Sequence, residues 1–360
     1  MRSVVLAGGG SAGHVSPLLA LADALRRRHP DLDITALGTA AGLESRLVPA
    51  RGYPLETLPK VVFPRRPSAD VLSLPGRLGA AVRAADRVVS GADVVVGFGG
   101  YVASPAYLAA RRRGIPIVVH EQNARPGLAN KLGARLTRHV AVTFDSTPLP
   151  HARVVGMPLR REIADLDRPA LRAEAQQAYG LDPAVPTLLV TGGSLGAKRL
   201  NDAFEAAAPQ IRAAGIQVIH LTGREKAFPA PTGPGPAYAV HEYADRMELA
   251  YAAADLVVAR SGANTICELT AVGLPAVYVP LPVGNGEQRV NATDVLAAGG
   301  GILIDDADFT PNRVMSDVVP LLTDPTRLAS MATAAASCGR RDADEALADM
   351  VEAAAAGATR

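Results

Sequence analysis

A strand-to-helix glycine turn occurs once in each half of this chain. The apolar run 3–7 leads into Gly-Gly-Gly-Ser-Ala-Gly at 8–13, and the apolar run 187–191 leads into Gly-Gly-Ser-Leu-Gly-Ala at 192–197. An apolar run, then glycines, then a helical pattern is typical of a buried strand that turns sharply into a helix. The repetition indicates two related α/β halves.

A second pair of landmarks follows the same order. Residues 92–96 lead to Gly99 and Gly100, as residues 254–258 lead to Ser261 and Gly262. The spacing between corresponding landmarks is similar but not constant, which indicates related halves with loops of different length. Each half also alternates short β-branched runs with helical stretches rich in alanine and leucine, a pattern that predicts parallel sheets with crossover helices.

Length and composition fit two globular domains. A chain of 360 residues is longer than one core usually needs. With 48% hydrophobic and 20% charged residues, it has enough apolar surface to bury and too little charge for disorder. We predict an α/β protein of two Rossmann-like parallel-sheet domains facing a cleft. The expected domains are 1–157 and 158–340, with a C-terminal helix over 341–360 that packs on the first.

Charge and cysteine content exclude several classes of protein. The net charge is +2 without runs of lysine and arginine, so we expect no nucleic-acid partner. The two cysteines, Cys267 and Cys338, provide neither a disulfide framework nor a cysteine zinc cluster and fit a reducing compartment. The apolar run 3–7 is too short for a signal peptide, and no run approaches the roughly 18 residues that cross a bilayer. We expect a cytoplasmic protein whose membrane contact, if any, is peripheral.

The glycine turns alone do not identify a ligand. The turn at 8–13 matches the dinucleotide fingerprint, but the next strand ends on Gly38 and Thr39, without the carboxylate that binds a ribose in NAD sites. The turn at 193–198 has the wrong glycine-to-lysine spacing for an ATP-binding loop. We expect no cofactor. Two such turns in one cleft can hold phosphates of two substrates, although glycines also serve simply to allow tight turns.

Six motifs occur in a fixed order along the chain. They are Gly-Ser-Ala-Gly-His at 10–14, Gly-Gly-Tyr-Val at 99–102, His-Glu-Gln-Asn at 120–123, Gly-Gly-Ser-Leu-Gly-Ala at 192–197, Arg-Ser-Gly-Ala at 260–263, and Glu-Gln at 287–288 before Asn-Ala at 291–292. Together they resemble the MurG family, the undecaprenyldiphospho-muramoylpentapeptide β-N-acetylglucosaminyltransferases, and the resemblance spans nearly the whole chain. It implies a glycosyltransferase-B fold, UDP-N-acetylglucosamine as donor, undecaprenyl-linked muramoyl-pentapeptide as acceptor, and inversion at the anomeric carbon without a metal.

The resemblance implies that the second domain binds the donor. Glu268 is expected to accept hydrogen bonds from both ribose hydroxyls, Gln288 to bind sugar hydroxyls, and Tyr243 to contact the uracil through its backbone. The family often has a second glutamine where this chain has Glu287, so the role of Glu287 stays open. The residues expected around the donor diphosphate are Arg160, Ser194, Ala263, Asn264 and Thr265.

In the first domain, His14 is the candidate catalytic base, because it follows the glycine turn at a helix start and histidine titrates in the useful range. It is equally open that His14 binds phosphate or substrate. Tyr101 and Asn123 are expected to line the sugar site, while His120 and Glu121 fit a buried network as well as a catalytic role. The candidate acceptor-diphosphate residues are Gly10, Ser11, Ala12, Gly13, Gly99 and Gly100, of which Ser11 and Gly13, with His14, are also candidate donor contacts.

Two Asp-x-Asp pairs, at 31–33 and 306–308, do not follow a nucleotide-binding strand as a metal-dependent transferase requires. We interpret them as solvated carboxylates and expect no metal site.

An apolar stripe near helical spacing lies beside several arginines. Such a stripe is usually ordinary core, but the resemblance favours a docking face for an anionic membrane. We therefore expect a peripheral enzyme of peptidoglycan synthesis at the cytoplasmic face of the cell membrane. The stripe consists of Leu74, Leu78, Val82 and Val89, and the arginines are Arg65, Arg66, Arg77, Arg83 and Arg87.

Three alternatives remain at this stage. A non-hydrolysing UDP-N-acetylglucosamine 2-epimerase shares the two-domain plan and needs no lipid acceptor. Another UDP-sugar-dependent transferase would share the donor site. A nucleotide-binding regulatory protein without chemistry would leave His14 unexplained.

Overall fold

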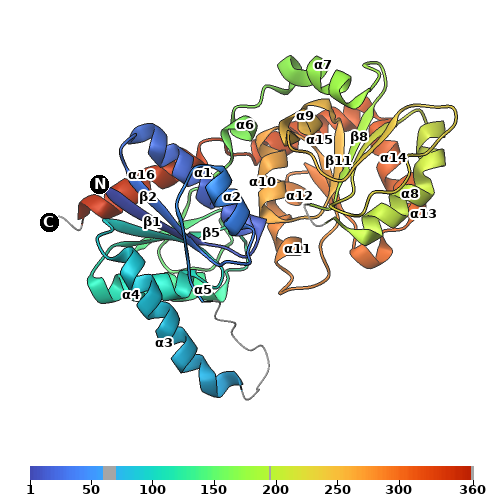
Figure 1. Cartoon of the computed structure of the whole chain (residues 1–360). Helices are drawn as coiled ribbons and strands as arrows, with labels where there is room; N and C mark the ends of the chain where they lie inside the picture. Colours follow the sequence, from blue (N-terminus) through green and yellow to red (C-terminus); the bar gives the residue numbers. More distant parts are fainter. Residues whose placement is uncertain (60–69, 194–195, 358–360) are drawn as a thin grey trace. The chain divides into compact units, whose positions relative to one another are not determined.

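The computed structural model describes residues 1–59, 70–193 and 196–357, with side chains in the helix that begins at Asp70 described from Pro75 onward. The chain divides into two compact units. The first comprises Met1–Arg160 together with Arg341–Arg360, and the second comprises Arg161–Arg340. Each unit is built on one parallel sheet (Figure 1), which confirms the predicted α/β class with two parallel-sheet domains.

The sheet of the first unit has seven strands in the order β3-β2-β1-β4-β5-β6-β7, and all neighbouring pairs are parallel. The chain order reverses between β1 and β4, which is where parallel sheets of this kind bind ligands. Both glycine turns of this unit leave the sheet at this switch point. The strands are β1 (Ser3–Gly8), β2 (Asp33–Gly38), β3 (Leu55–Thr57), β4 (Val94–Gly99), β5 (Ile117–Glu121), β6 (His139–Val142) and β7 (Ala152–Val154).

Helices cover both faces of this sheet. One core cluster joins α1 and α16 to the sheet, and another joins α3 and α4 to the opposite face, as Figure 1 also shows. Such double coverage explains why the strands are continuous apolar runs rather than alternating ones. The helices are α1 (Ala12–Arg28), α2 (Glu44–Ala50), α3 (Asp70–Val89), α4 (Ala103–Arg113), α5 (Leu128–Gly133) and α16 (Ala343–Gly357).

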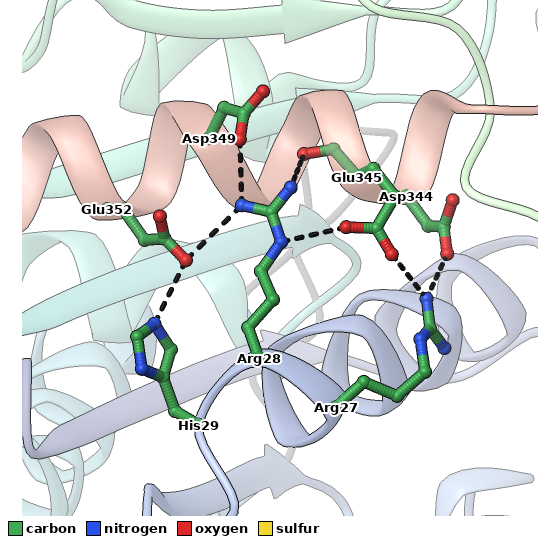
Figure 2. A network of polar contacts seen from close by, with 7 residues as sticks. All are labelled: Arg27, Arg28, His29, Asp344, Glu345, Asp349 and Glu352. Atoms are coloured by element: carbon green, nitrogen blue, oxygen red, sulfur yellow. Dashed lines mark hydrogen bonds and ion pairs between the residues drawn. The ribbon is translucent and has the colours of Figure 1, made fainter.

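The C-terminal helix α16 is joined to the end of α1 by an ion-pair cluster (Figure 2). Arg28 contacts the carboxylates of Glu345, Asp349 and Glu352 at 2.7, 2.7 and 3.3 Å. Arg27 pairs with Asp344 and Glu345, and His29 with Glu352. On the inner side of α16, Leu347 and Val351 are fully buried. The last helix is therefore an integral part of the first unit.

The second unit has six parallel strands in the order β10-β9-β8-β11-β12-β13, again with a switch point, between β8 and β11. Its strands are β8 (Thr187–Thr191), β9 (Gln217–Leu221), β10 (Tyr238–His241), β11 (Leu256–Ala259), β12 (Ala276–Tyr278) and β13 (Gly301–Leu303). Its helices are α6 (Arg161–Ala164), α7 (Arg168–Tyr179), α8 (Lys198–Ala213), α9 (Met247–Ala253), α10 (Ala263–Ala271), α11 (Glu287–Asn291), α12 (Thr293–Ala297), α13 (Pro311–Arg313), α14 (Val319–Leu322) and α15 (Pro325–Ser337), with a 3-10 turn at Asp306–Asp308 and a π-helical turn at Val314–Val318.

The apolar stripe on α3 is largely core. Val89 is fully buried, Val82 is 8% exposed, and Leu78 packs partly against the same cluster. The expectation that these valines face a membrane is wrong, because α3 must cover the sheet and α4. The side chain of Leu74, together with Arg65 and Arg66, lies outside the described residues.

Among the helices of the described ranges, none combines the length and apolar character needed to span a bilayer.

Candidate active site

The first glycine turn connects β1 to α1 at the switch point. Gly8 pairs with Gly99 at the ends of the two central strands, and Gly10 has a φ of +88°, a backbone conformation that favours glycine. Ser11 caps α1 with extended dihedrals, but its side chain does not accept a capping hydrogen bond from a backbone N–H of the helix. The first turn of α1 therefore keeps N–H groups directed at the carboxyl edge of the sheet, where an anion can bind.

His14 lies in this first turn of α1 and is held in one orientation. Its Nδ1 is 3.0 Å from the Gly9 carbonyl oxygen and 3.2 Å from Ser11 Oγ. A carbonyl oxygen only accepts, so Nδ1 carries the proton and Nε2 keeps the lone pair. Burial lowers the pKa of His14, while the Glu121 carboxylate, the bond to Gly9 and the Glu44 carboxylate oppose that shift. A neutral imidazole with a lone pair on Nε2 is the form that a general base requires.

Gly99 and Gly100 allow the close approach of β4 to this turn. Both have left-handed φ angles, +91° and +77°. A β-carbon at Gly99 would lie 3.2 Å from His14 Nε2, and one at Gly100 would lie 2.6 Å from the Gly9 oxygen. The two glycines therefore keep the space around the imidazole open, whether or not their own N–H groups bind phosphate.

The loop after β5 is organised by Glu121, whose carboxylate is only 2% exposed. Oε1 accepts from the backbone N–H of Asn123 at 2.9 Å, and Oε2 accepts from Gly127 N and Asn130 Nδ2, each at 3.0 Å. These bonds place Asn123 at the carboxyl edge of the sheet. Tyr101, just after β4, is 37% exposed near the same edge.

His120 belongs to a buried network. Its Nε2 donates to the Gly156 carbonyl at 2.9 Å, and its Nδ1 accepts from Gln122 Nε2 at 2.9 Å. Burial lowers the pKa of His120 to about 4, against the opposing bond to Gly156. With both ring nitrogens occupied and no exposed surface, His120 is structural.

Glu44 is a site residue that sequence reasoning missed. Its carboxylate is fully buried, accepts from Gly10 N at 2.8 Å, and accepts from Thr39 N and Oγ1 at 2.8 and 2.7 Å. Burial opposes ionisation, but these hydrogen bonds outweigh it and lower the pKa of Glu44. The sequence signal for Glu44 was a set of glycines, Gly9, Gly38 and Gly42, that make room for its side chain. A β-carbon at any of them would lie within 2.6 Å of that side chain.

In the second unit, α10 begins directly after β11 at the switch point. Gly262 caps the helix without a side-chain bond, and no acidic residue lies in the first turn. Ala263 is buried, whereas Asn264 and Thr265 are partly exposed. An uncapped helix start with an apolar or neutral first turn suits a diphosphate.

The second glycine turn follows β8, which is the neighbour of β11 in the sheet. Gly193 and Gly196 have φ of +81° and +66°, and a β-carbon at Gly196 would lie 2.0 Å from the Thr222 oxygen. The glycines are thus required by the turn itself. Ser194, a candidate diphosphate ligand, lies outside the described residues.

Glu268 lies on α10 and is oriented by a residue that sequence reasoning did not identify. The hydroxyl of Tyr251, on α9, donates to Glu268 Oε2 at 2.8 Å. Tyr251 is 2% exposed, while Glu268 is partly exposed. The bond restricts the carboxylate to one orientation at the surface of the unit.

Glu287 and Gln288 have different roles at the start of α11. Glu287 Oε2 accepts from Asn285 N at 3.1 Å, so the carboxylate folds back on its own loop. Gln288 Oε1 accepts from Leu281 N at 2.9 Å, which directs its amide nitrogen, a donor, away from that contact. Tyr243 is 47% exposed after β10 and stacks with Arg224.

Two further positions bear on the predictions. Arg160 is the last residue of the first unit before the chain enters the second.

Asp306 was interpreted as a solvated carboxylate, and this is wrong. Its side chain is only 12% exposed and pairs with Arg260 and Arg199 at 2.6 and 3.1 Å. The burial of Arg260 requires a counter-charge.

The chain belongs to glycosyltransferase family 28. Residues 4–142 match the N-terminal domain of that family and residues 187–347 match its C-terminal domain. The chain is therefore an enzyme that transfers a hexose.

Two relatives within this family share the name of one particular transferase. The chain is 57% identical over 352 residues to a protein of Streptomyces avermitilis, covering 97% of each, and 60% identical over 353 residues to one of a Nocardioides species, again covering 97% of each. Both are named UDP-N-acetylglucosamine–N-acetylmuramyl-(pentapeptide) pyrophosphoryl-undecaprenol N-acetylglucosamine transferase.

Solved structures agree with this placement. The crystal structure of Acinetobacter baumannii MurG superposes with a TM-score of 0.81 at 28% identity, covering 98% of this chain and 100% of that one. The calicheamicin glycosyltransferase CalG4 superposes with a TM-score of 0.68 at 21% identity, covering 98% of each, and shows the shared fold. The fold is thus the glycosyltransferase-B fold of MurG.

Proposed function

We propose that this enzyme transfers N-acetylglucosamine from UDP-N-acetylglucosamine to undecaprenyl-diphospho-N-acetylmuramoyl-pentapeptide, with inversion at the anomeric carbon. The observation that carries the proposal is the identity of 57% or more, over nearly the full length, to relatives named for this reaction. The geometry of the two switch points supports it, because each unit has an open helix start at the edge where phosphates bind.

In this proposal the second unit binds the donor. Glu268, oriented by the hydroxyl of Tyr251, accepts hydrogen bonds from the ribose hydroxyls. The start of α10 and Ser194 bind the diphosphate, and Gln288 donates to a sugar hydroxyl. Stabilising the developing charge on UDP as the glycosidic C–O bond breaks lowers the barrier to transfer.

The first unit binds the acceptor in this proposal. The backbone around Ser11–Gly13 faces the acceptor diphosphate, and Tyr101 and Asn123 line the sugar site. The acceptor hydroxyl attacks the anomeric carbon, its proton moves to Nε2 of His14, and UDP leaves with the electrons of the broken bond. The Nδ1–H bond to Gly9 supports this role, because it leaves Nε2 as the accepting nitrogen.

The lipid-linked acceptor requires contact with a membrane surface. We propose peripheral binding at the cytoplasmic face, within peptidoglycan synthesis and hence in cell-wall growth and division. The exposed arginines of α3, Arg83 and Arg87, support an electrostatic contact with anionic lipid.

The test combines purified protein, labelled UDP-N-acetylglucosamine and a short-chain muramoyl-diphospho-lipid. Label in the lipid supports the proposal, whereas a free epimer of the donor identifies a 2-epimerase and no product identifies a binding protein. Asn123→Ala and Glu268→Ala test the site assignments, because full activity in either variant contradicts them.

A further inference from the structure

The peptide bond between Gly9 and Gly10 links two ionisable side chains. Its carbonyl oxygen accepts from His14 Nδ1 at 3.0 Å, and its N–H donates to Glu44 Oε2 at 2.8 Å. One amide group therefore bridges a buried carboxylate and the imidazole proposed as the base. The connection between Glu44 and His14 runs through this one peptide group and involves no other side chain.

The surroundings hold this amide firmly. A β-carbon at Gly9 would lie 2.3 Å from Glu44 Oε1, and one at Gly100 would lie 2.6 Å from the Gly9 oxygen. Glu44 in turn is held by Thr39, through both its backbone N–H and its hydroxyl. A fully buried carboxylate is costly, and three short hydrogen bonds from two partners are what keeps it ionised.

The arrangement has an electronic consequence. An amide whose N–H donates to a carboxylate becomes polarised, so its carbonyl oxygen becomes a stronger acceptor. That oxygen binds the Nδ1–H of His14. A stronger bond at Nδ1 fixes the tautomer and makes Nε2 more basic, as a carboxylate does when it binds a catalytic histidine directly.

We propose that Glu44 is a positioning residue that acts on His14 through the Gly9–Gly10 peptide, fixing the Nδ1–H tautomer and increasing the basicity of Nε2. This proposal rests on the proposed function only for the catalytic use of Nε2. The groups that face His14 are Glu121 from β5 and Glu44 from α2, and both oppose the lowering of its pKa by burial. Glu44 is the one connected to the ring by hydrogen bonds.

The first measurement uses the unaltered protein without substrate. Nitrogen-15 NMR of the histidine ring should show neutral His14 with Nδ1 protonated and Nε2 unprotonated. The amide proton of Gly10 should lie downfield and shift as His14 titrates, because both bonds share one peptide. A His14 protonated on Nε2, or a Gly10 amide that ignores the titration, overturns the proposal.

The second measurement uses Glu44→Gln, which keeps the shape of the side chain but removes its charge. We expect the pKa of His14 to fall by about 0.5–1 unit and the acidic limb of the kcat profile to move to lower pH by the same amount. We expect kcat on the plateau to fall about two- to threefold, since a weaker base removes the proton less well. An unchanged His14 titration in folded Glu44→Gln contradicts the proposal.

Two controls separate this role from a purely structural one. Glu56→Gln removes an exposed carboxylate on β3 and should leave both the titration and kcat unchanged. Thr39→Ser keeps the hydroxyl that binds Glu44 and should retain the pH profile. The NMR measurements need no turnover, so absent transferase activity would count against the proposed function and not against the link between Glu44 and His14.

Discussion

The hydroxyl group of Tyr251 orients Glu268, the proposed ligand of the donor ribose. The bond from Tyr251 occupies Oε2 and fixes the carboxylate plane, and a fixed carboxylate binds a pair of hydroxyls with less loss of conformational entropy than a mobile one. Tyr251 has no contact role of its own in the proposed reaction. Its effect should therefore appear in binding and not in the chemical step.

We predict that Tyr251→Phe raises KM for UDP-N-acetylglucosamine about tenfold with kcat unchanged, which corresponds to about 1.4 kcal/mol for a hydrogen bond to a charged group. Glu268→Gln should raise KM further. Steady-state kinetics at varied donor concentration measure both. As a control, Tyr53→Phe removes a similar hydroxyl-to-carboxylate bond, to Asp23, in the first unit and should leave KM unchanged. Equal effects of the two tyrosine variants would refute the assignment.

The buried His120 makes stability depend on pH. Burial lowers its pKa to about 4, from 6.5 in the unfolded chain, so the folded protein binds its proton less readily. The contribution of neutral His120 to the free energy of unfolding is therefore fully present above pH 6.5. It is lost as the pH falls toward 4, by up to about 3 kcal/mol. Urea unfolding at several pH values should show this slope. His120→Gln should reduce it, and the exposed His151→Asn should not; a slope unchanged in His120→Gln would be the contrary result.

At the scale of elements, α16 determines whether the first unit is complete. It follows the whole second unit in sequence, yet its inner face is buried against α1 and the first sheet. The ion pairs of Figure 2 are partly exposed, so each is worth little alone, but Arg28 contacts three carboxylates at once.

We predict that Arg28→Ala lowers the free energy of unfolding of the first unit by about 1–2 kcal/mol at low salt, because three acidic side chains lose a shared partner. The difference should shrink in about 1 M salt as screening weakens the pairs. Denaturant unfolding at two salt concentrations measures it. Arg161→Ala removes a single exposed pair with Asp165 and should change stability by less than about 0.5 kcal/mol. No salt dependence in Arg28→Ala would exclude an electrostatic origin.

The membrane contact proposed for α3 can use only the outward face of the helix, since Val82 and Val89 are in the core. We predict that Arg83→Glu with Arg87→Glu weakens binding to anionic vesicles at least tenfold, at about 1 kcal/mol per charge near the surface. Vesicle co-sedimentation measures it. The control, Arg111→Glu with Arg112→Glu, places the same charge change on exposed positions of α4. Equal losses in the two double variants would indicate non-specific attraction and not docking by α3.

At the scale of the whole molecule, each unit has its own hydrophobic core. The two clusters of the first unit and the cluster of the second share no residue. Two independent cores predict two unfolding transitions, and a ligand that binds one unit should stabilise that unit alone.

We predict that calorimetry resolves two transitions and that UDP raises only the one of Arg161–Arg340. At a hundredfold excess over Kd the gain is about 2.7 kcal/mol, which shifts Tm by a few degrees. Arg28→Ala should lower the Tm of the first unit alone, which identifies the unit that unfolds in each transition. ADP, with the same diphosphate but a purine base, should shift the transition less. If UDP instead raised the Tm of the transition that Arg28→Ala lowers, the donor site would lie in the first unit and the proposed assignment would be wrong.

Local sequence patterns were enough to predict the two parallel-sheet units and the positions of the glycine turns. These follow from local properties: continuous apolar runs form buried strands, and Gly10, Gly99 and Gly196 are needed for left-handed turns. His14 could be named as a candidate in advance because it directly follows the first glycine turn, and Glu268 because the resemblance to the MurG family implied a ribose-binding carboxylate there.

The partners of the buried polar groups became known from the folded structure. Glu44 is 34 residues from Gly10, and Arg28 is 317 residues from Glu345, so no local pattern connects them. The stripe on α3 and the carboxylate of Asp306 were misjudged for the same reason: an apolar or charged side chain looks alike in sequence whether it faces solvent or the core. Burial is a property of the folded chain, because it depends on which distant segment packs against each side chain.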